Sequence, residues 1–152
     1  MTTDPIVKTI RVGLDPDAAF DLFANRIAEW WPMERHSVSA NTGATGASIE
    51  VEPQIGGALA EICPDGTRHI WGHFQEWAPG RAFAMTWHPG HGPERQTSLR
   101  VTFDGDSNGT TVALTHSGWE ALEDGARVRT GYDGGWDGVL ADYAAAVLEP
   151  AE

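Results

Sequence analysis

The end of the chain carries the pattern that most limits the choice of fold, an apolar stripe with helical spacing. The apolar residues of this segment are Trp136, Val139, Leu140, Tyr143, Val147 and Leu148. Their i, i+3, i+4, i+7 recurrence predicts a helix with one buried face. Asp133 is the expected N-cap, and Pro150 is expected to end a helix of about 13 residues. Little else in the sequence predicts a long helix, so this helix must pack against strands.

The central part of the chain alternates between apolar and polar residues, as strands with one buried face do. The alternation is cleanest in residues 81–87, 96–103 and 110–116. One face of these segments carries Phe83, Met85, Trp87, Leu99, Val101, Phe103, Val112, Leu114 and His116. Further strands are predicted at residues 5–14, 49–53, 58–63 and 68–77. Such one-sided patterns are typical of antiparallel sheets.

Residues 68–77 fit this pattern less well than the other strands. If Ile70, Gly72 and Phe74 point inward, Trp71 and His73 point outward. A β-bulge near Glu76 would reverse the facing of the remainder. An exposed Trp71 would then be a candidate contact in a homodimer.

Two short helices are expected after the first strand. Asp15 is a suitable N-cap before Pro16, and an apolar stripe follows at Ala19, Phe20 and Phe23. A second short helical turn, over residues 27–31, is expected to end at Pro32. Residues 32–48 are polar and contain glycine, so they predict a long loop, either a functional lid or a mobile connection. Together the elements predict one α+β domain over residues 1–152, an antiparallel sheet with its helices on one face.

Charge and cysteine content exclude several classes of function. The net charge is −12 with only ten Lys and Arg residues, which argues against nucleic acid and anionic membranes as partners. No apolar run approaches the length of a membrane span. Cys63 is the only cysteine, so no internal disulfide can form, and a buried, inert thiol is expected. We therefore expect a soluble, cytoplasmic protein.

Three sequence segments resemble a known family. They are residues 72–87, which form a strand, an Ala-Pro-Gly turn and a second strand; residues 114–119, Leu-Thr-His-Ser-Gly-Trp; and residues 134–143, which begin Gly-Gly-Trp. In this order they resemble the START-like or SRPBCC superfamily, and within it the family named after the activator of the Hsp90 ATPase (AHSA-like). The resemblance covers nearly the whole chain. It implies a helix-grip fold, in which a curved antiparallel sheet of about six to seven strands wraps around the C-terminal helix.

The resemblance also implies a cavity between that helix and the concave sheet. The superfamily includes lipid and polyketide binders, aromatase/cyclases, antibiotic-sequestering proteins and a cochaperone domain. The sequence lacks the additional N-terminal domain of eukaryotic cochaperones, so a chaperone partner is not expected. The predicted ligand-binding residues are Trp31, Phe74, Phe83, Met85, Trp87, Leu99, Val101, Phe103, Leu114, His116, Trp119, Trp136, Leu140 and Tyr143. The alternative is that these side chains fill a solid core.

Few polar residues in the sequence are candidates for chemistry. His116 and Tyr143 are weak catalytic candidates, because they are the polar members of the inward faces. His69 and His73 would lie about 13 Å apart along one strand, too far to share a metal. His88 and His91 share a turn without further zinc ligands nearby, so no metal and no cofactor are expected. The carboxylates Glu50, Glu52, Glu61 and Glu76 are expected on the solvated outer face.

The leading hypothesis is a small-molecule-binding protein that holds a hydrophobic or aromatic ligand without chemistry. An apolar pocket with few polar groups suits such a ligand. The first alternative is an enzyme similar to polyketide cyclases or dehydratases, in which a pocket histidine acts as acid or base. The second is an interaction protein that resembles the activator of a chaperone ATPase.

Overall fold

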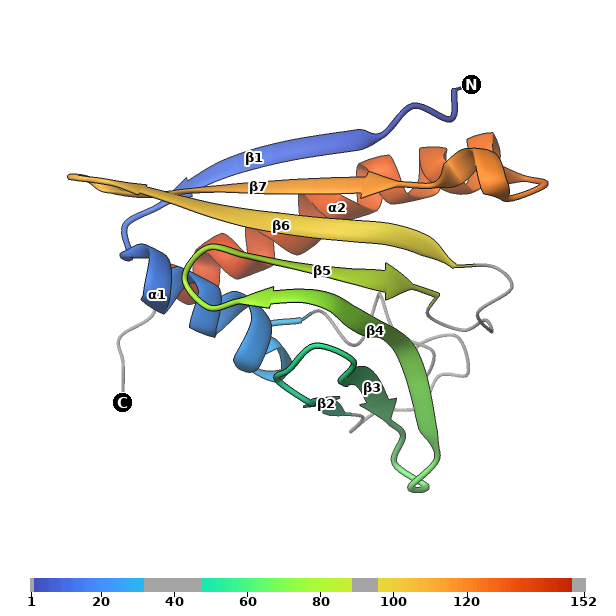
Figure 1. Ribbon diagram of the computed structural model, residues 1–152, viewed down its shortest axis with the longest axis horizontal. Coiled ribbons are helices and arrows are strands. Elements are labelled where there is room, and N and C mark those ends of the chain that lie inside the picture. Colours follow the sequence, from blue (N-terminus) through green and yellow to red (C-terminus); the bar gives the residue numbers. More distant parts are fainter. Residues whose placement is uncertain (1, 32–47, 89–95, 149–152) are drawn as a thin grey trace.

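The computed structural model describes residues 2–31, 48–88 and 96–148 and contains a curled, seven-stranded antiparallel sheet with a long C-terminal helix packed against it (Figure 1). The strand order is β1-β7-β6-β5-β4-β3-β2. The strands are β1 (Ile6–Val12), β2 (Ser48–Val51), β3 (Ala58–Ile62), β4 (Arg68–Ala78), β5 (Ala82–Trp87), β6 (Thr97–Asp106) and β7 (Gly109–Ser117). The helices are α1 (Pro16–Phe20), the π-helical turn η1 (Asp21–Asn25), the 3₁₀ turns η2 (Ile27–Glu29) and η5 (Trp119–Ala121), and α2 (Gly125–Leu148). The predicted α+β helix-grip arrangement is confirmed.

Strands β5, β6 and β7 have the inward faces that their alternation predicts. In the register of the sheet, Met85 is paired with Leu99, and Leu99 is paired with His116. The predicted inward residues of these strands are all buried, whereas Arg100 on the opposite face is exposed. Alternation therefore identified one wall of the core correctly.

The short helices begin and end close to their predicted positions. The Asp15 carboxylate accepts a hydrogen bond from the Ala18 amide at 2.8 Å, and Pro16 occupies the first turn of α1. The predicted apolar stripe is buried, and Trp30 and Trp31 are buried just after η2. The predicted loop at 32–48 lies mostly outside the described residues, although Ser48 belongs to β2.

Helix α2 is longer than predicted and begins at Gly125, so the prediction of Asp133 as N-cap is wrong. The apolar stripe continues toward the N-terminus through Val128 and Tyr132, which pack against the core. Asp133 lies within the helix and binds Lys8 of β1 at 2.9 Å. Glycines at 131, 134, 135 and 138 concealed this helix, because glycine disfavours helices intrinsically. Packing of the stripe overrides that preference.

The glycines of α2 allow a prediction about stability. Side chains at Gly131 and Gly134 would meet no atom within 4 Å. The double substitution Gly131→Ala and Gly134→Ala should therefore raise the free energy of unfolding by about 1–2 kcal/mol, because alanine reduces the entropy of the unfolded chain. Thermal unfolding should show a Tm about 3–6 °C higher. Gly125→Ala is the control and should destabilise, because its new side chain would collide with the Trp119 carbonyl. An unchanged or lower Tm in the double variant would contradict the prediction.

Strand β4 differs from its predicted facing at Trp71, which is fully buried. Leu59 of β3 is paired with Gly72 and Ala60 with Ile70, so Trp71 is the extra residue of a bulge and turns inward. A side chain at Gly72 would collide with the Thr86 carbonyl, so this bulge needs glycine. The prediction that an exposed Trp71 forms a dimer contact is therefore wrong.

The irregularity expected near Glu76 is present, between Phe74 and Glu76. It brings both Phe74 and Trp77 to the inner side, with their rings 4.7 Å apart. His73 is exposed, as predicted. Two irregularities in one strand therefore place three aromatic side chains in the core.

The prediction for the strand glutamates holds for three of the four. Glu50 and Glu52 are exposed, and Glu76 binds Arg100 on the outer face at 2.9 Å. Glu61 is fully buried, so its predicted outward facing is wrong. It lies two residues after Leu59 in β3, and alternation gives both residues the same inner face.

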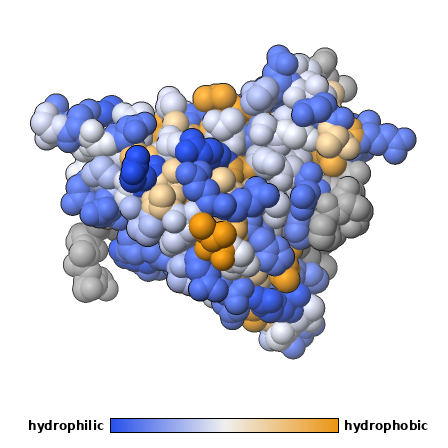
Figure 2. Space-filling model, viewed as in Figure 1, coloured by the Kyte–Doolittle hydropathy of each residue, from blue (hydrophilic) through white to orange (hydrophobic). Residues whose placement is uncertain are grey.

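Figure 2 shows one face of the molecule, which is mostly hydrophilic with small and separate hydrophobic areas. Among the described residues, the large apolar side chains that are strongly exposed are Val7 and Ile55. No helix within the described ranges is both long enough and apolar enough to cross a membrane.

Candidate ligand-binding site

A small apolar cavity lies between the sheet, the short helices and α2. It measures about 10 Å³, which is room for roughly one water molecule. The lining residues come from η1, η2, β3, β4, β5, β6, α2 and the short segment that follows η2. They are Phe23, Ala24, Ile27, Trp31, Leu59, Phe74, Phe83, Met85, Trp87, Leu99 and Trp136. Every lining side chain is apolar except for the indole N–H groups.

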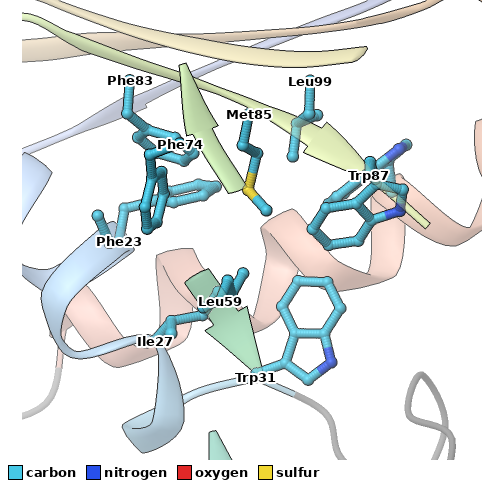
Figure 3. A pocket seen from close by; sticks show the side chains of 11 residues that line it. Phe23, Ile27, Trp31, Leu59, Phe74, Phe83, Met85, Trp87 and Leu99 are labelled. Carbon is cyan, nitrogen blue, oxygen red and sulfur yellow. The ribbon is translucent and has the colours of Figure 1, made fainter. Parts of the chain in front are cut away.

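The Met85 side chain occupies the middle of this site (Figure 3). Its thioether lies between the phenyl rings of Phe23, Phe74 and Phe83 on one side and the indoles of Trp31 and Trp87 on the other. Methionine has three rotatable bonds and a polarisable sulfur, so it fills irregular spaces and changes rotamer easily. Met85 is therefore the side chain that most directly controls the free volume.

Half of the predicted ligand-binding residues line this cavity: Trp31, Phe74, Phe83, Met85, Trp87, Leu99 and Trp136. The others are buried elsewhere in the core: Val101, Phe103, Leu114, His116, Trp119, Leu140 and Tyr143. Sequence reasoning missed Phe23, Ala24, Ile27 and Leu59 as lining residues. The i, i+4 spacing of Phe23 and Ile27 was the available signal, because it places both on one side of the helical segment.

His116 is held by hydrogen bonds at both ring nitrogens. The Trp136 indole N–H donates to Nδ1 at 3.0 Å, and Nε2 lies 2.6 Å from the Thr97 hydroxyl. An indole nitrogen can only donate, so Nδ1 is the acceptor and Nε2 carries the proton of the neutral ring. Nε2 then donates to Thr97, whose hydroxyl donates to the Trp87 carbonyl at 3.3 Å. Two lining residues, Trp87 and Trp136, are thus connected through one histidine.

The environment of His116 keeps its ring neutral. Burial lowers its pKa from 6.5 to about 3, because a charged imidazolium would be desolvated. The rings of Trp119 and Tyr132 lie 4.2 and 5.0 Å from the imidazole. A neutral histidine with both nitrogens occupied supports the aromatic wall and is poorly suited to proton transfer.

The hydroxyl groups of Tyr143 and Tyr132 also form hydrogen bonds within the protein. The Tyr143 hydroxyl donates to the Ala19 carbonyl at 2.9 Å, and burial raises the pKa of this tyrosine. The Tyr132 hydroxyl accepts from the Trp87 indole at 3.2 Å, and burial raises its pKa as well. Tyr143 therefore connects α2 to α1 and does not reach the cavity.

The part of the chain that the structure describes contains no set of side chains that could bind a metal ion. No group of three or more His, Cys, Asp or Glu residues there could hold an ion. His88 is buried, and its amide donates to the Trp71 carbonyl at 2.6 Å. His91, the second histidine of the predicted turn, lies outside the described residues.

Solved structures of other proteins share this fold. Protein MLL2253 from Mesorhizobium loti superposes with a TM-score of 0.69 at 16% identity, over 93% of this chain and 95% of that one. The Aha1 dimer from Colwellia psychrerythraea gives 0.66 at 13% identity, over 95% and 94%. The structure of an anthrahydroquino-γ-pyrone synthase, Txn09, complexed with SUM, gives 0.61 at 28% identity, over 97% and 100%.

A comparison with curated proteins found no significant match. The family model described as activator of Hsp90 ATPase homolog 1-like protein matches residues 15–149. This range begins at the N-cap of α1 and extends past the end of α2, so it includes every residue of the cavity. The chain belongs to the activator of Hsp90 ATPase homolog 1-like family.

Proposed function

We propose that the protein binds a flat, apolar or aromatic small molecule at the cavity between the sheet and α2. The observation that supports this proposal is the continuous apolar lining, with aromatic rings from both sides of the core around space that side chains leave unfilled. Aromatic side chains bury large apolar areas and pack favourably against the edges and faces of other rings. The lining is thus complementary to a ring system.

Binding requires the site to open, because pockets for drug-sized ligands measure about 300–1,000 Å³. The cavity of about 10 Å³ is far smaller than that. A new rotamer of Met85 would release the centre of the site with little change in the backbone. The burial of a ligand's apolar surface offsets the free energy of this rearrangement.

A thermal-shift and calorimetric titration with two-ring and three-ring aromatic compounds tests the proposal. A ligand present at about 100 times its Kd should raise the Tm by about 5 °C or more. Leu99→Phe places a ring in the cavity and should abolish the shift. Leu122→Phe, at a partly buried position that does not line the cavity, is the matched control and should retain it. The proposal fails if no compound in the panel raises the Tm or produces heat.

A second candidate is an enzyme that acts on an aromatic polyketide. It is favoured by the similarity to the synthase Txn09, at 28% identity over 97% of this chain. The hydrogen bonds of His116 do not favour that residue as the acid or base. Turnover of a poly-β-keto analogue, followed by mass spectrometry, distinguishes an enzyme from a binding protein. If the variant His116→Ala folds but loses turnover, His116 takes part in the reaction after all.

Two further proposals are that the protein forms a homodimer and that it binds a chaperone. Each can be tested separately from small-molecule binding. A solution mass near 16.4 kDa indicates a monomer, and twice that mass indicates a dimer. A change in the hydrolysis rate of a chaperone ATPase upon addition of the protein would favour the interaction role.

A further inference from the structure

Three tryptophans that contact one another form one end of the cavity. The ring centres of Trp31 and Trp87 lie 5.9 Å apart, those of Trp31 and Trp136 lie 6.0 Å apart, and those of Trp87 and Trp136 lie 5.5 Å apart. All three side chains are buried and line the cavity. A ligand at this indole end would therefore lie beside three indole rings at once.

The three indole rings are strongly tilted against one another, with angles of 56°, 78° and 47° between their planes. At such angles a ligand ring beside the cluster cannot lie against the edges of all three indoles, so it contacts the face of at least one. The face of an aromatic ring carries partial negative charge, and its edge carries partial positive charge. Among side chains, indole has the face that attracts positive charge most strongly. The indole end therefore favours a ligand surface of positive potential.

Two of these indoles donate their N–H groups to other residues of the protein. The Trp87 N–H donates to the Tyr132 hydroxyl at 3.2 Å, and the Trp136 N–H donates to Nδ1 of His116 at 3.0 Å. Donation of the N–H shifts electron density into the ring, because a hydrogen bond polarises both of its partners. These bonds also commit both N–H groups, so the ring surface is what Trp87 and Trp136 offer to a ligand.

The apolar lining favours a neutral ligand over a cation. A cation would also be attracted to the indole faces. However, none of the described lining residues carries a charge, so a buried cation would lose its hydration without gaining an anionic partner. A neutral ring with electron-withdrawing substituents avoids this cost. Such a ring has a positive face and a negative rim, which is the reverse of the charge distribution of indole.

We propose that the ligand is an electron-poor aromatic compound, with nitro, carbonyl or halogen substituents on its ring, and that Trp31, Trp87 and Trp136 select it. The positive face of the ligand would stack on an indole. Its negative rim would meet the positive edges of the phenyl rings on the other side of Met85 (Figure 3). This inference rests on the proposed binding function and specifies its ligand.

Four naphthalenes test the inference by calorimetry on the full chain. 1-Nitronaphthalene and octafluoronaphthalene are electron-poor, whereas naphthalene and 1-methoxynaphthalene are electron-rich. Each electron-poor compound should bind about fivefold more tightly than either electron-rich compound, because one favourable pair of rings is worth about that factor. 1-Nitronaphthalene and 1-methoxynaphthalene are close in size, so apolar burial alone predicts similar affinities for these two. Equal affinities, or tighter binding of 1-methoxynaphthalene, would overturn the inference without any variant.

The variant Trp31→Leu removes one indole and should lower the preference for 1-nitronaphthalene over 1-methoxynaphthalene about threefold. Ile27→Leu is the matched control, because Ile27 also lines the cavity but has no ring. It should change both affinities by the same factor and leave the preference unaltered. A preference of full size in Trp31→Leu would overturn the role of the indoles.

The outcomes separate this inference from the proposed function. If Trp31→Leu does not fold, the comparison of the four compounds on the unsubstituted protein decides. If none of the naphthalenes binds, the proposed function fails. If they bind without a preference for the electron-poor compounds, only the inference about the ligand class fails.

Discussion

The variant His116→Gln is expected to lose most of the pH dependence of stability that the protein shows between pH 6.5 and pH 4. In the folded protein burial lowers the pKa of His116 from 6.5 to about 3, so the unfolded chain takes up a proton in this range and the folded chain does not. The stability contributed by neutral His116 is fully present above pH 6.5 and is lost as the pH falls toward 3. The expected loss by pH 4 is about 3 kcal/mol.

Urea unfolding at several pH values measures this effect. At pH 7 the variant should also be less stable by about 2–4 kcal/mol, because the Trp136 indole and the Thr97 hydroxyl lose their shared partner. His73→Gln, at an exposed position, is the control and should leave the pH profile unchanged. Exposed carboxylates with a lowered pKa, such as Asp106 at about 2, lose most of their contribution to stability below pH 4. A variant that retains the full slope would show that His116 is not the titrating group.

The variant Met85→Ala is expected to be less stable by about 2–5 kcal/mol and to bind two-ring aromatic compounds at least tenfold more tightly. Met85 is buried, and its thioether occupies the centre of the cavity, so truncation removes packing and leaves an apolar space. A ligand no longer has to displace this side chain. Apolar cavities of this kind stay dry and accept small aromatic molecules.

Urea unfolding with and without 2-methylnaphthalene checks both parts of the Met85 prediction. Leu114→Ala is the matched control, because Leu114 is fully buried and does not line the cavity. It should destabilise by a similar amount without a gain in affinity. If both variants gain affinity equally, general loosening of the core explains the result. If neither gains affinity, the space around Met85 is not the binding site.

The sequence predicted the fold where a single physical signal dominates. The alternation in β5, β6 and β7 determined the inner wall, because antiparallel strands with one wet face must alternate. The Asp15-Pro16 pair located α1, because both residues favour a helix start. Helix α2 was predicted too short, since its five glycines weaken the local helix signal and only tertiary packing restores it.

Half of the predicted site residues line the cavity, whereas the facing predicted for Trp71 and for Glu61 is wrong. The facing of Trp71 depends on the register between β3 and β4, which strict alternation within β4 does not reveal. The prediction placed Glu61 by its polarity, whereas the structure places it by its spacing from Leu59. His116 is on the predicted face, but only the positions of Trp136 and Thr97 show that its nitrogens are occupied.

The pairing of β1 affects how the chain is built during synthesis. β1 is the first strand to be made, and its partner in the sheet is β7, the last strand, while Lys8 also binds Asp133 and Asp137 in α2. At about 5–20 residues per second, translation takes roughly 5–20 s to proceed from one of these strands to the other. Throughout that interval β1 has no partner strand, because β7 has not yet been made. The pairing of β1 with β7 must therefore be among the last steps of folding, after most of the polypeptide has left the ribosome.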